Sequence, residues 1–411
     1  MKYHIITYGC QMNISDSERF AKALESLGFT KSDEKNADLL VLNICSVKQS
    51  AVDKALAHKK NNKKTIITGC YLEKDKRKFK ADYFMRIDKL KDLDKVLKSI
   101  GFSINQNMSI SHYLDIEPLY GSKISALVPI MTGCNNFCSY CVVPYTRNRE
   151  ISRPMPDILN EIKKLVNNGT KEIWLLGQNV NSYKPSFASL LKKVNEINGN
   201  FWIRFTSCHP KDLSIDVIEA FAKSKKITPY FNLPIQSGDD TILKMMNRPY
   251  TVNQYKKLIK QTRQAFKKYR SEPVFLSTDI IVGFPGETKK QFNNTKRALK
   301  KIKFSMAYIS RYSPRPHTKA YSLKDDISNQ EKKHREKQLD KIIRKTALKF
   351  NKQFLNKQVE CLITHKKRDW YIGKTRHYQT IMIKSNKNLI NQFVKVRVYK
   401  VEPFRLICKN S

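Results

Sequence analysis

Three cysteines stand within eight residues of one another in the segment "TGCNNFCSYCVVPYTRNRE": Cys134, Cys138 and Cys141. A structural zinc site usually has four protein ligands, and the next Cys and His along the chain are as distant as Cys208 and His209. Soft thiolates favour iron–sulfur clusters. Three thiolates can hold three irons of a four-iron cubane and leave the fourth iron open. The spacing therefore predicts a cluster that binds a further ligand.

Three more cysteines follow apolar runs near the N-terminus. Cys10 follows "KYHIITYG", Cys45 ends "ADLLVLNIC" and Cys70 ends "KKTIITGC". Each run predicts a strand, and helical segments lie between them, so we expect a doubly wound α/β domain. Ser15 or Asp16 is expected to cap the first helix. The carboxyl ends of parallel strands share one edge, so the three thiols should meet there, although three ordinary buried cysteines would give the same pattern.

From about residue 126, strands and helices alternate about six times, which predicts an open or partial (βα)6 barrel. In such barrels the site lies at the C-terminal ends of the strands. Polar turns follow several of these strands, and each of their side chains could bind a cofactor or simply form a turn or cap a helix. The candidates are Gln178, Asn179, Ser207, Gln236 and Asp279.

A long charged helix is expected over residues 329–354, and five short strands after it predict a small β-barrel. In that barrel Lys374, Arg376 and Tyr378 combine two cations with a stacking ring, a combination that RNA-binding surfaces use, although a solvated loop would explain it equally well. The expected domains are therefore residues 1–105, 120–345 and 350–411.

The 411 residues include 78 Lys and Arg against 36 Asp and Glu, a formal net charge of +42. Such a charge favours a polyanionic partner such as nucleic acid, although a Lys-rich composition is also what an AT-rich genome would produce. No apolar run approaches the ~20 residues of a membrane span, and the N-terminus lacks the pattern of a signal peptide. The chain has nine cysteines, and because the cytoplasm keeps thiols reduced we do not expect them to form disulfides. We expect a cytoplasmic monomer without a membrane partner.

The Cys-x3-Cys-x2-Cys motif, with Tyr140 before its last cysteine, resembles the signature of radical S-adenosylmethionine (SAM) enzymes. The segments "TYGCQMNISDSE", "LNICSVKQSA" and "TGCYLEKD" resemble the N-terminal cluster domain of the radical SAM methylthiotransferases. "YIGKTRHYQTIMIKSNKNLINQFVKVRVYKV" resembles the TRAM domain, a small RNA-binding β-barrel. Together these segments cover nearly the whole chain. One departure is Asn148, which stands where the family usually has glycine.

The resemblance implies that SAM binds the open iron of the Cys134, Cys138 and Cys141 cluster, with contacts from Tyr140 and the polar turns. It implies a second [4Fe–4S] cluster on Cys10, Cys45 and Cys70. The segments "LLGQNVNSY", "RFTSCHPKD" and "TDIIVGFPGET" look most like the tRNA 2-methylthioadenosine synthases.

Members of that group methylthiolate carbon 2 of an N-isopentenylated adenosine beside the anticodon, with SAM as methyl donor and radical source. The implied partners are a tRNA anticodon stem-loop and a reductant such as flavodoxin or ferredoxin. Related methylthiotransferases act instead on threonylcarbamoyl-adenosine in tRNA or on an Asp of a ribosomal protein, and a non-catalytic iron–sulfur RNA-binding protein is a further alternative. His58 and His209 are expected to be structural, and Cys208 a spectator.

Overall fold

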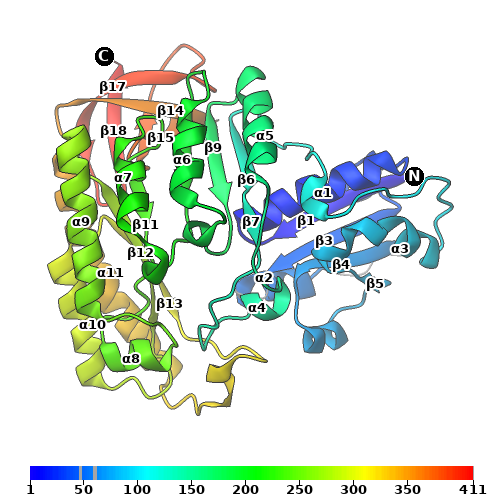
Figure 1. Ribbon diagram of the computed structural model, residues 1–411, viewed down its shortest axis with the longest axis horizontal. Coiled ribbons are helices and arrows are strands. Elements are labelled where there is room, and N and C mark those ends of the chain that lie inside the picture. Colours follow the sequence, from blue (N-terminus) through cyan, green and yellow to red (C-terminus); the bar gives the residue numbers. More distant parts are fainter. Residues whose placement is uncertain (46–48, 59–62, 411) are drawn as a thin grey trace.

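The computed structural model describes residues 1–45, 49–58 and 63–410, so residues 46–48 of the segment "LNICSVKQSA" lie outside the described residues. The N-terminal domain is a parallel five-stranded sheet of order β2-β1-β3-β4-β5, flanked by helices (Figure 1). This arrangement confirms the α/β prediction. Its elements are β1 Lys2–Tyr8, α1 Gln11–Ser26, β2 Thr30–Lys31, β3 Leu39–Cys45, α2 Gln49–Leu56, β4 Lys64–Cys70, η1 Glu73–Lys78, β5 Tyr83–Phe84, η2 Ile87–Asp92 and α3 Leu93–Ser99.

A connector with the short helix η3 (Tyr113–Asp115) leads to the core. Six parallel strands form two three-stranded sheets of order β10-β9-β6 and β11-β12-β13. An isolated bridge links Ile203 of β10 to Ile227, just before β11. The prediction of a partial (βα)6 barrel is confirmed. The strands are β6 Ser125–Pro129, β9 Glu172–Leu176, β10 Trp202–Phe205, β11 Tyr230–Asn232, β12 Phe275–Val282 and β13 Met306–Arg311.

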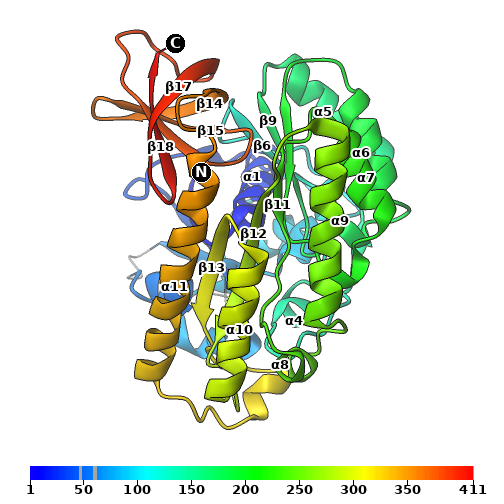
Figure 2. The ribbon, with the colours of Figure 1, turned by 90° about the vertical axis from the view of Figure 1, so that its left-hand side faces the viewer.

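Helices cover the outside of this barrel (Figure 2), and their apolar faces fill the main core between helices and strands. The helices are α5 Met155–Asn167, η4 Val180–Ser182, α6 Phe187–Glu196, η5 Pro210–Asp212, α7 Ile215–Lys223, α8 Asp240–Met245, α9 Val252–Arg270, α10 Lys289–Ile302 and η6 Lys319–Ser322. The cysteine-rich loop after β6 is enclosed by the short antiparallel pair β7 (Met131–Thr132) and β8 (Ile151–Ser152) and contains α4 (Val143–Thr146).

The long helix α11 (Asn329–Lys352) runs beside β13 and α10 and carries the C-terminal barrel at its end (Figure 2). That barrel is closed in the order β14-β15-β16-β18-β17, as the five strand patterns predicted. Its strands are β14 Gln358–Lys367, β15 Trp370–Thr375, β16 Thr380–Ile383, β17 Phe393–Val401 and β18 Arg405–Asn410. In the described part of the chain, no helix has both the length and the apolar character that crossing a membrane requires.

Candidate functional site

The N-terminal cysteines meet at one edge of the five-stranded sheet. Cys45 and Cys70 are partners in the register of β3 and β4, and Cys10 follows β1, whose Tyr8 pairs with Ile44. The Cys45 thiol forms hydrogen bonds with both Cys10 and Cys70. These bonds with Cys45 lower the pKa of Cys10 to about 6 and that of Cys70 to about 7. The same bonds raise the pKa of Cys45.

The chain around these thiols is tightly constrained. Helix α1 begins at Gln11 with Cys10 as its N-cap, so the prediction of a cap at Ser15 or Asp16 was wrong by about one and a half turns. The reason is Asn13, whose side-chain oxygen accepts from the Cys10 amide at 3.1 Å and supplies the cap. Before Cys70, Gly69 has φ +95, and a Cβ there would lie 2.3 Å from the Asn43 side-chain oxygen.

Arg147 connects this cysteine set to the core. It follows α4 in the loop of the other cysteine set, and its Nε donates to the Cys70 sulfur at 2.9 Å. Its Nη2 pairs with Asp16 of α1 at 2.5 Å, with side chains 2% and 0% exposed. In the described part of the chain, Arg147 Nη1 and Asp16 Oδ1 have no hydrogen-bond partner. The guanidinium therefore holds positive charge beside the buried sulfur of Cys70.

Asn148, the departure from the family pattern, lies in the left-handed region with φ 61. Asparagine tolerates this conformation better than most residues. Its side chain accepts from Arg86 Nη2 at 2.8 Å and donates to Asp88 at 2.9 Å. The asparagine therefore serves the turn and also ties the cysteine loop to the N-terminal domain.

The cysteine loop of the core is closed at its base, where the Cys134 amide donates to Asn148 O at 3.1 Å, and is held at its middle by Ser139. Gly133 has φ +80, and a Cβ there would lie 2.0 Å from the Arg149 carbonyl oxygen. The Ser139 amide donates to Met246 O at 3.0 Å.

Burial raises the pKa of Cys134 to about 11 and that of Cys141 to about 12. Thiolates at such positions need a nearby positive charge, which a bound iron–sulfur cluster would supply.

All three core cysteines open on one cavity of about 470 Å³. Two of its residues, Ser207 (φ 64) and Gln236 (φ 68), have left-handed backbones, a strain that functional sites often hold. The structure thus places every candidate cofactor-binding residue in the lining of this one cavity. The lining includes Gln11, Cys134, Cys138, Tyr140, Cys141, Trp174, Gln178, Asn179, Ser207, His209, Tyr230, Asn232, Gln236, Arg248, Asp279, Tyr308 and Tyr378.

Several buried polar atoms of this lining have no partner among the described residues: Gln178 Oε1, Asn179 Oδ1 and His209 Nε2. His209 Nδ1 accepts from the Lys211 amide at 3.2 Å, so in the neutral ring Nε2 carries the proton. Burial, with Arg248 nearby, lowers the pKa of His209 to about 2 and keeps the ring neutral. Unpaired buried groups are costly, so this lining suits a ligand that offers both donors and acceptors, as the amino, carboxylate and ribose groups of SAM do.

Two cavity residues were not expected from the sequence. His209 was predicted to be structural, and its side chain does cap η5, but the residue also lines the cavity. Arg248, which drew no attention in "MNRPY", is buried and its Nη1 lies 3.6 Å from the Cys138 sulfur. His209 occurs in the polar turn that follows β10, which is a signal that could have found it, whereas Arg248 lies between α8 and α9, where no strand end points to it.

Neither cysteine set surrounds a point as the ligands of one ion would, and no such group of three His, Cys, Asp or Glu occurs in the described residues. Arg147 lies beside Cys70 and Arg248 beside Cys138, so each set has a guanidinium next to its sulfurs, which suits an anionic cluster. The assignment of the six cysteines as iron ligands stays a prediction.

The candidate RNA-binding residues lie between the C-terminal barrel and the core. Arg204 of β10 donates to Thr375 O at 2.9 Å and to Arg376 O at 3.0 Å. Lys374 Nζ lies 4.3 Å from the centre of the Tyr378 ring, and Tyr378 lines the cavity. These side chains are half-buried. Their role in RNA binding stays a prediction.

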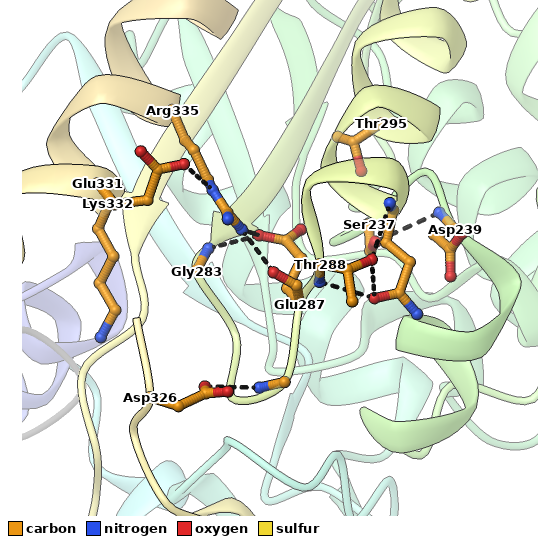
Figure 3. A network of polar contacts seen from close by, with 12 residues as sticks. Ser237, Asp239, Gly283, Glu287, Thr288, Thr295, Asp326, Glu331, Lys332 and Arg335 are labelled. Carbon is orange, nitrogen blue, oxygen red and sulfur yellow. Dashed lines mark hydrogen bonds and ion pairs between the residues drawn. The ribbon is translucent and has the colours of Figure 1, made fainter. Parts of the chain in front are cut away.

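The turn "GFPGET" has a mainly structural role in this arrangement (Figure 3). Glu287 accepts from the Gly283 amide at 2.8 Å and from Arg335 Nη1 at 2.7 Å. Arg335, from α11, also pairs with Glu331 at 2.8 Å. The network fixes the end of β12 to α11 and so braces the barrel wall that carries Asp279.

Comparison with known proteins agrees with this geometry. The model of the Radical SAM superfamily matches residues 128–299, and that of uncharacterized protein family UPF0004 matches residues 2–87. A solved radical S-adenosylmethionine methyltransferase, TsrM from Kitasatospora setae, has a similar fold, with TM-score 0.59 and 11% identity, covering 78% of this chain and 75% of that one. The core is that of a radical SAM enzyme, a class that uses a [4Fe–4S] cluster and SAM.

Curated relatives are similar over almost the whole chain. A tRNA-2-methylthio-N(6)-dimethylallyladenosine synthase of Carboxydothermus hydrogenoformans is 37% identical, covering 98% of this chain and 98% of the relative. One from Dictyoglomus thermophilum is 36% identical, covering 97% and 96%. The chain therefore belongs to the family of the tRNA-2-methylthio-N(6)-dimethylallyladenosine synthases.

Proposed function

We propose that this chain transfers a methylthio group to carbon 2 of N6-dimethylallyladenosine in tRNA. The relatives' names support the substrate, and their similarity extends over the N-terminal domain, the core and the C-terminal barrel. The proposed enzyme holds two [4Fe–4S] clusters. Their ligands are Cys134, Cys138 and Cys141 for the cluster that binds SAM, and Cys10, Cys45 and Cys70 for the cluster that presents sulfur.

The observation that carries this proposal is that the cavity lined by the core cysteines extends to the residue beside the N-terminal set. Cys134, Cys138 and Cys141 line it, and so does Gln11, the residue directly after Cys10. Cys10 is exposed while Cys45 and Cys70 are buried, so this set is open on the Cys10 side. A substrate in the cavity would therefore lie between a site for SAM and a site for sulfur.

The reaction explains why the chain has both sets. Carbon 2 of adenine bears an unactivated C–H bond that has no acidity for a general base to use. Bound SAM and its cluster supply radical chemistry and a methyl group. The protein's own part is to orient SAM through Gln178, Asn179 and His209, to keep water from the cavity, and to hold the N-terminal thiols beside it through Arg147.

The proposed partners are a tRNA anticodon stem-loop and a reductant such as flavodoxin or ferredoxin, in the cytoplasm. In support of an RNA partner, a groove of about 1060 Å³ lies between α9, α10 and α11 beside the C-terminal barrel. Cations on such a surface bind phosphates without reading sequence. The lining of this groove includes Arg263, Lys267, Lys296, Lys300, Lys303, Lys341, Lys345 and Lys349, together with Glu272.

The test uses the chain reconstituted anaerobically with iron and sulfide, then incubated with SAM, dithionite and tRNA. Mass spectrometry of the digested nucleosides should show a methylthio group on dimethylallyladenosine. The Cys138→Ala variant, which loses one ligand of the SAM cluster, is the matched control and should give no product. Product on threonylcarbamoyl-adenosine alone, or on a ribosomal-protein Asp, would assign the chain to another methylthiotransferase activity.

A further inference from the structure

One end of the cavity consists of aromatic rings from two domains. Trp174 of β9 and Tyr230 of β11 line it from the core, with ring centres 6.2 Å apart. Tyr378, from the turn between β15 and β16, lines it from the C-terminal barrel. Its ring centre lies 5.3 Å from that of Trp174 and 4.5 Å from that of Tyr230. The C-terminal barrel therefore completes the wall of the barrel that holds the cysteines.

The position of Tyr378 is unusually well fixed. Its φ of 66 is in the left-handed region, which is rare for a bulky side chain and normally favours glycine. Its amide donates to Thr375 O at 2.9 Å, and Arg204 holds the same turn through Thr375 O and Arg376 O. Strain of this kind persists only where the surroundings impose it. An aromatic ring at a glycine-type position, aimed into the cavity, indicates that the ring itself is needed.

The three rings pack against apolar side chains, and the nearest charged groups, including Glu172 on Trp174 Nε1, lie outside the cavity lining. Met12, Leu176 and Phe275 belong to the same cluster. Lys374 and Arg204 contact the Tyr378 ring, but neither is among the described residues that line the cavity. An alkenyl group gains free energy when it is buried in such surroundings, whereas a carboxylate without a paired cation loses it.

We propose that Trp174, Tyr230 and Tyr378 form the pocket for the dimethylallyl group on N6 of the substrate adenosine, so that Tyr378 determines specificity from the C-terminal barrel. The inference rests on the proposed function and adds to it the site that reads the N6 substituent. A threonylcarbamoyl substituent, which carries a carboxylate and a hydroxyl, is expected to fit this pocket poorly.

Binding of three synthetic anticodon stem-loops to the reconstituted protein with SAM tests the pocket. They differ only at N6, which bears hydrogen, dimethylallyl or threonylcarbamoyl. Fluorescence anisotropy should show at least about a tenfold preference of the unchanged protein for dimethylallyl over hydrogen, since single methylenes already give about 10–200-fold discrimination. Tyr378→Gly removes the ring at a position whose backbone suits glycine, so the protein should fold, keep its iron and lose most of the preference.

Two further variants complete the experiment. Tyr378→Phe keeps the ring and should keep the preference. Tyr399→Ala removes a 47% exposed tyrosine from β17 of the same barrel and should change the preference by less than about twofold. Equal preference in Tyr378→Gly and the unchanged protein, or tighter binding of the threonylcarbamoyl stem-loop, would overturn the pocket.

The outcomes separate the pocket from the reaction. If the unchanged protein prefers the dimethylallyl stem-loop through Tyr378 but mass spectrometry finds no methylthio product, the pocket stands and the proposed reaction is refuted. If the product forms and Tyr378→Gly has the full preference, the reaction stands and the pocket is refuted.

Discussion

Removal of the Glu172 carboxylate should strongly destabilise the junction between the core and the C-terminal barrel. Glu172 accepts from Arg204 Nε at 2.5 Å, from Trp174 Nε1 at 2.8 Å and from Ser125 Oγ at 2.9 Å. Arg204 is 0% exposed, and Glu172 is 8% exposed. Arg204 also holds the turn that carries Tyr378. In Glu172→Ala the guanidinium would stay buried without a counter-charge.

Breaking one partner of such a buried pair costs about 3–5 kcal/mol, a large part of the roughly 5–15 kcal/mol that typically stabilises a folded protein. Chemical denaturation followed by tryptophan fluorescence measures the effect, because Trp174 and Trp202 lie beside Arg204. The double variant Glu172→Leu/Arg204→Met removes both charges and should be less destabilised than the sum of its single changes. As a surface control, Glu219→Ala breaks an exposed i,i+4 pair with Lys223 and should leave the denaturation midpoint unchanged.

The same pair predicts a pH dependence. Burial alone would raise the pKa of Glu172, but the Arg204 guanidinium and the hydrogen bonds bring it below its ordinary value. A carboxylate whose pKa is lowered by folding stabilises the folded state fully above its unfolded pKa of roughly 4.3, and this contribution is lost as the pH falls further. Denaturation midpoints of the unchanged protein should therefore fall more steeply below about pH 4 than those of Glu172→Ala. A change below 1 kcal/mol in Glu172→Ala, together with strict additivity in the double variant, would refute the reasoning.

Three other changes give distinct results. Cys138→Ala should abolish the formation of 5′-deoxyadenosine from SAM and dithionite. Cys45→Ala should still release 5′-deoxyadenosine but make no methylthiolated nucleoside. Equal loss of 5′-deoxyadenosine in both folded variants would contradict separate roles for the two cysteine sets. Arg147→Leu removes the charge 2.9 Å from the Cys70 sulfur. It should therefore lower the iron bound by the N-terminal cysteines and change the electron paramagnetic resonance spectrum of their cluster. An iron content equal to that of the unchanged protein, with an unchanged spectrum, would exclude this role of Arg147. Glu287→Ala should cost about 1–3 kcal/mol of stability, because Arg335 keeps its pair with Glu331 but loses its buried partner, as does the Gly283 amide. Denaturation measures the effect, and a midpoint equal to that of the unchanged protein would show that the network in Figure 3 is not needed.

The sequence by itself was sufficient for the fold and for the placement of the cysteines. Strands with apolar runs end at Cys45 and Cys70, and parallel pairing puts such ends side by side whatever the other contacts are. The periodic segments likewise gave the six strands of the core and the five-stranded barrel. These features depend on local patterns of hydrophobicity and on turns, which neighbouring residues set.

Only the tertiary structure decided which side chains act on the site from other domains. Arg147 reaches Cys70 across 77 positions of the chain, and Arg204 reaches Arg376 across 172. Contacts between residues so far apart depend on how the three domains pack, which no local pattern contains. For the same reason the sequence predicted Tyr378 as an RNA-binding residue from its neighbours, and only the packing of the barrel against the core places it in the lining of the cavity.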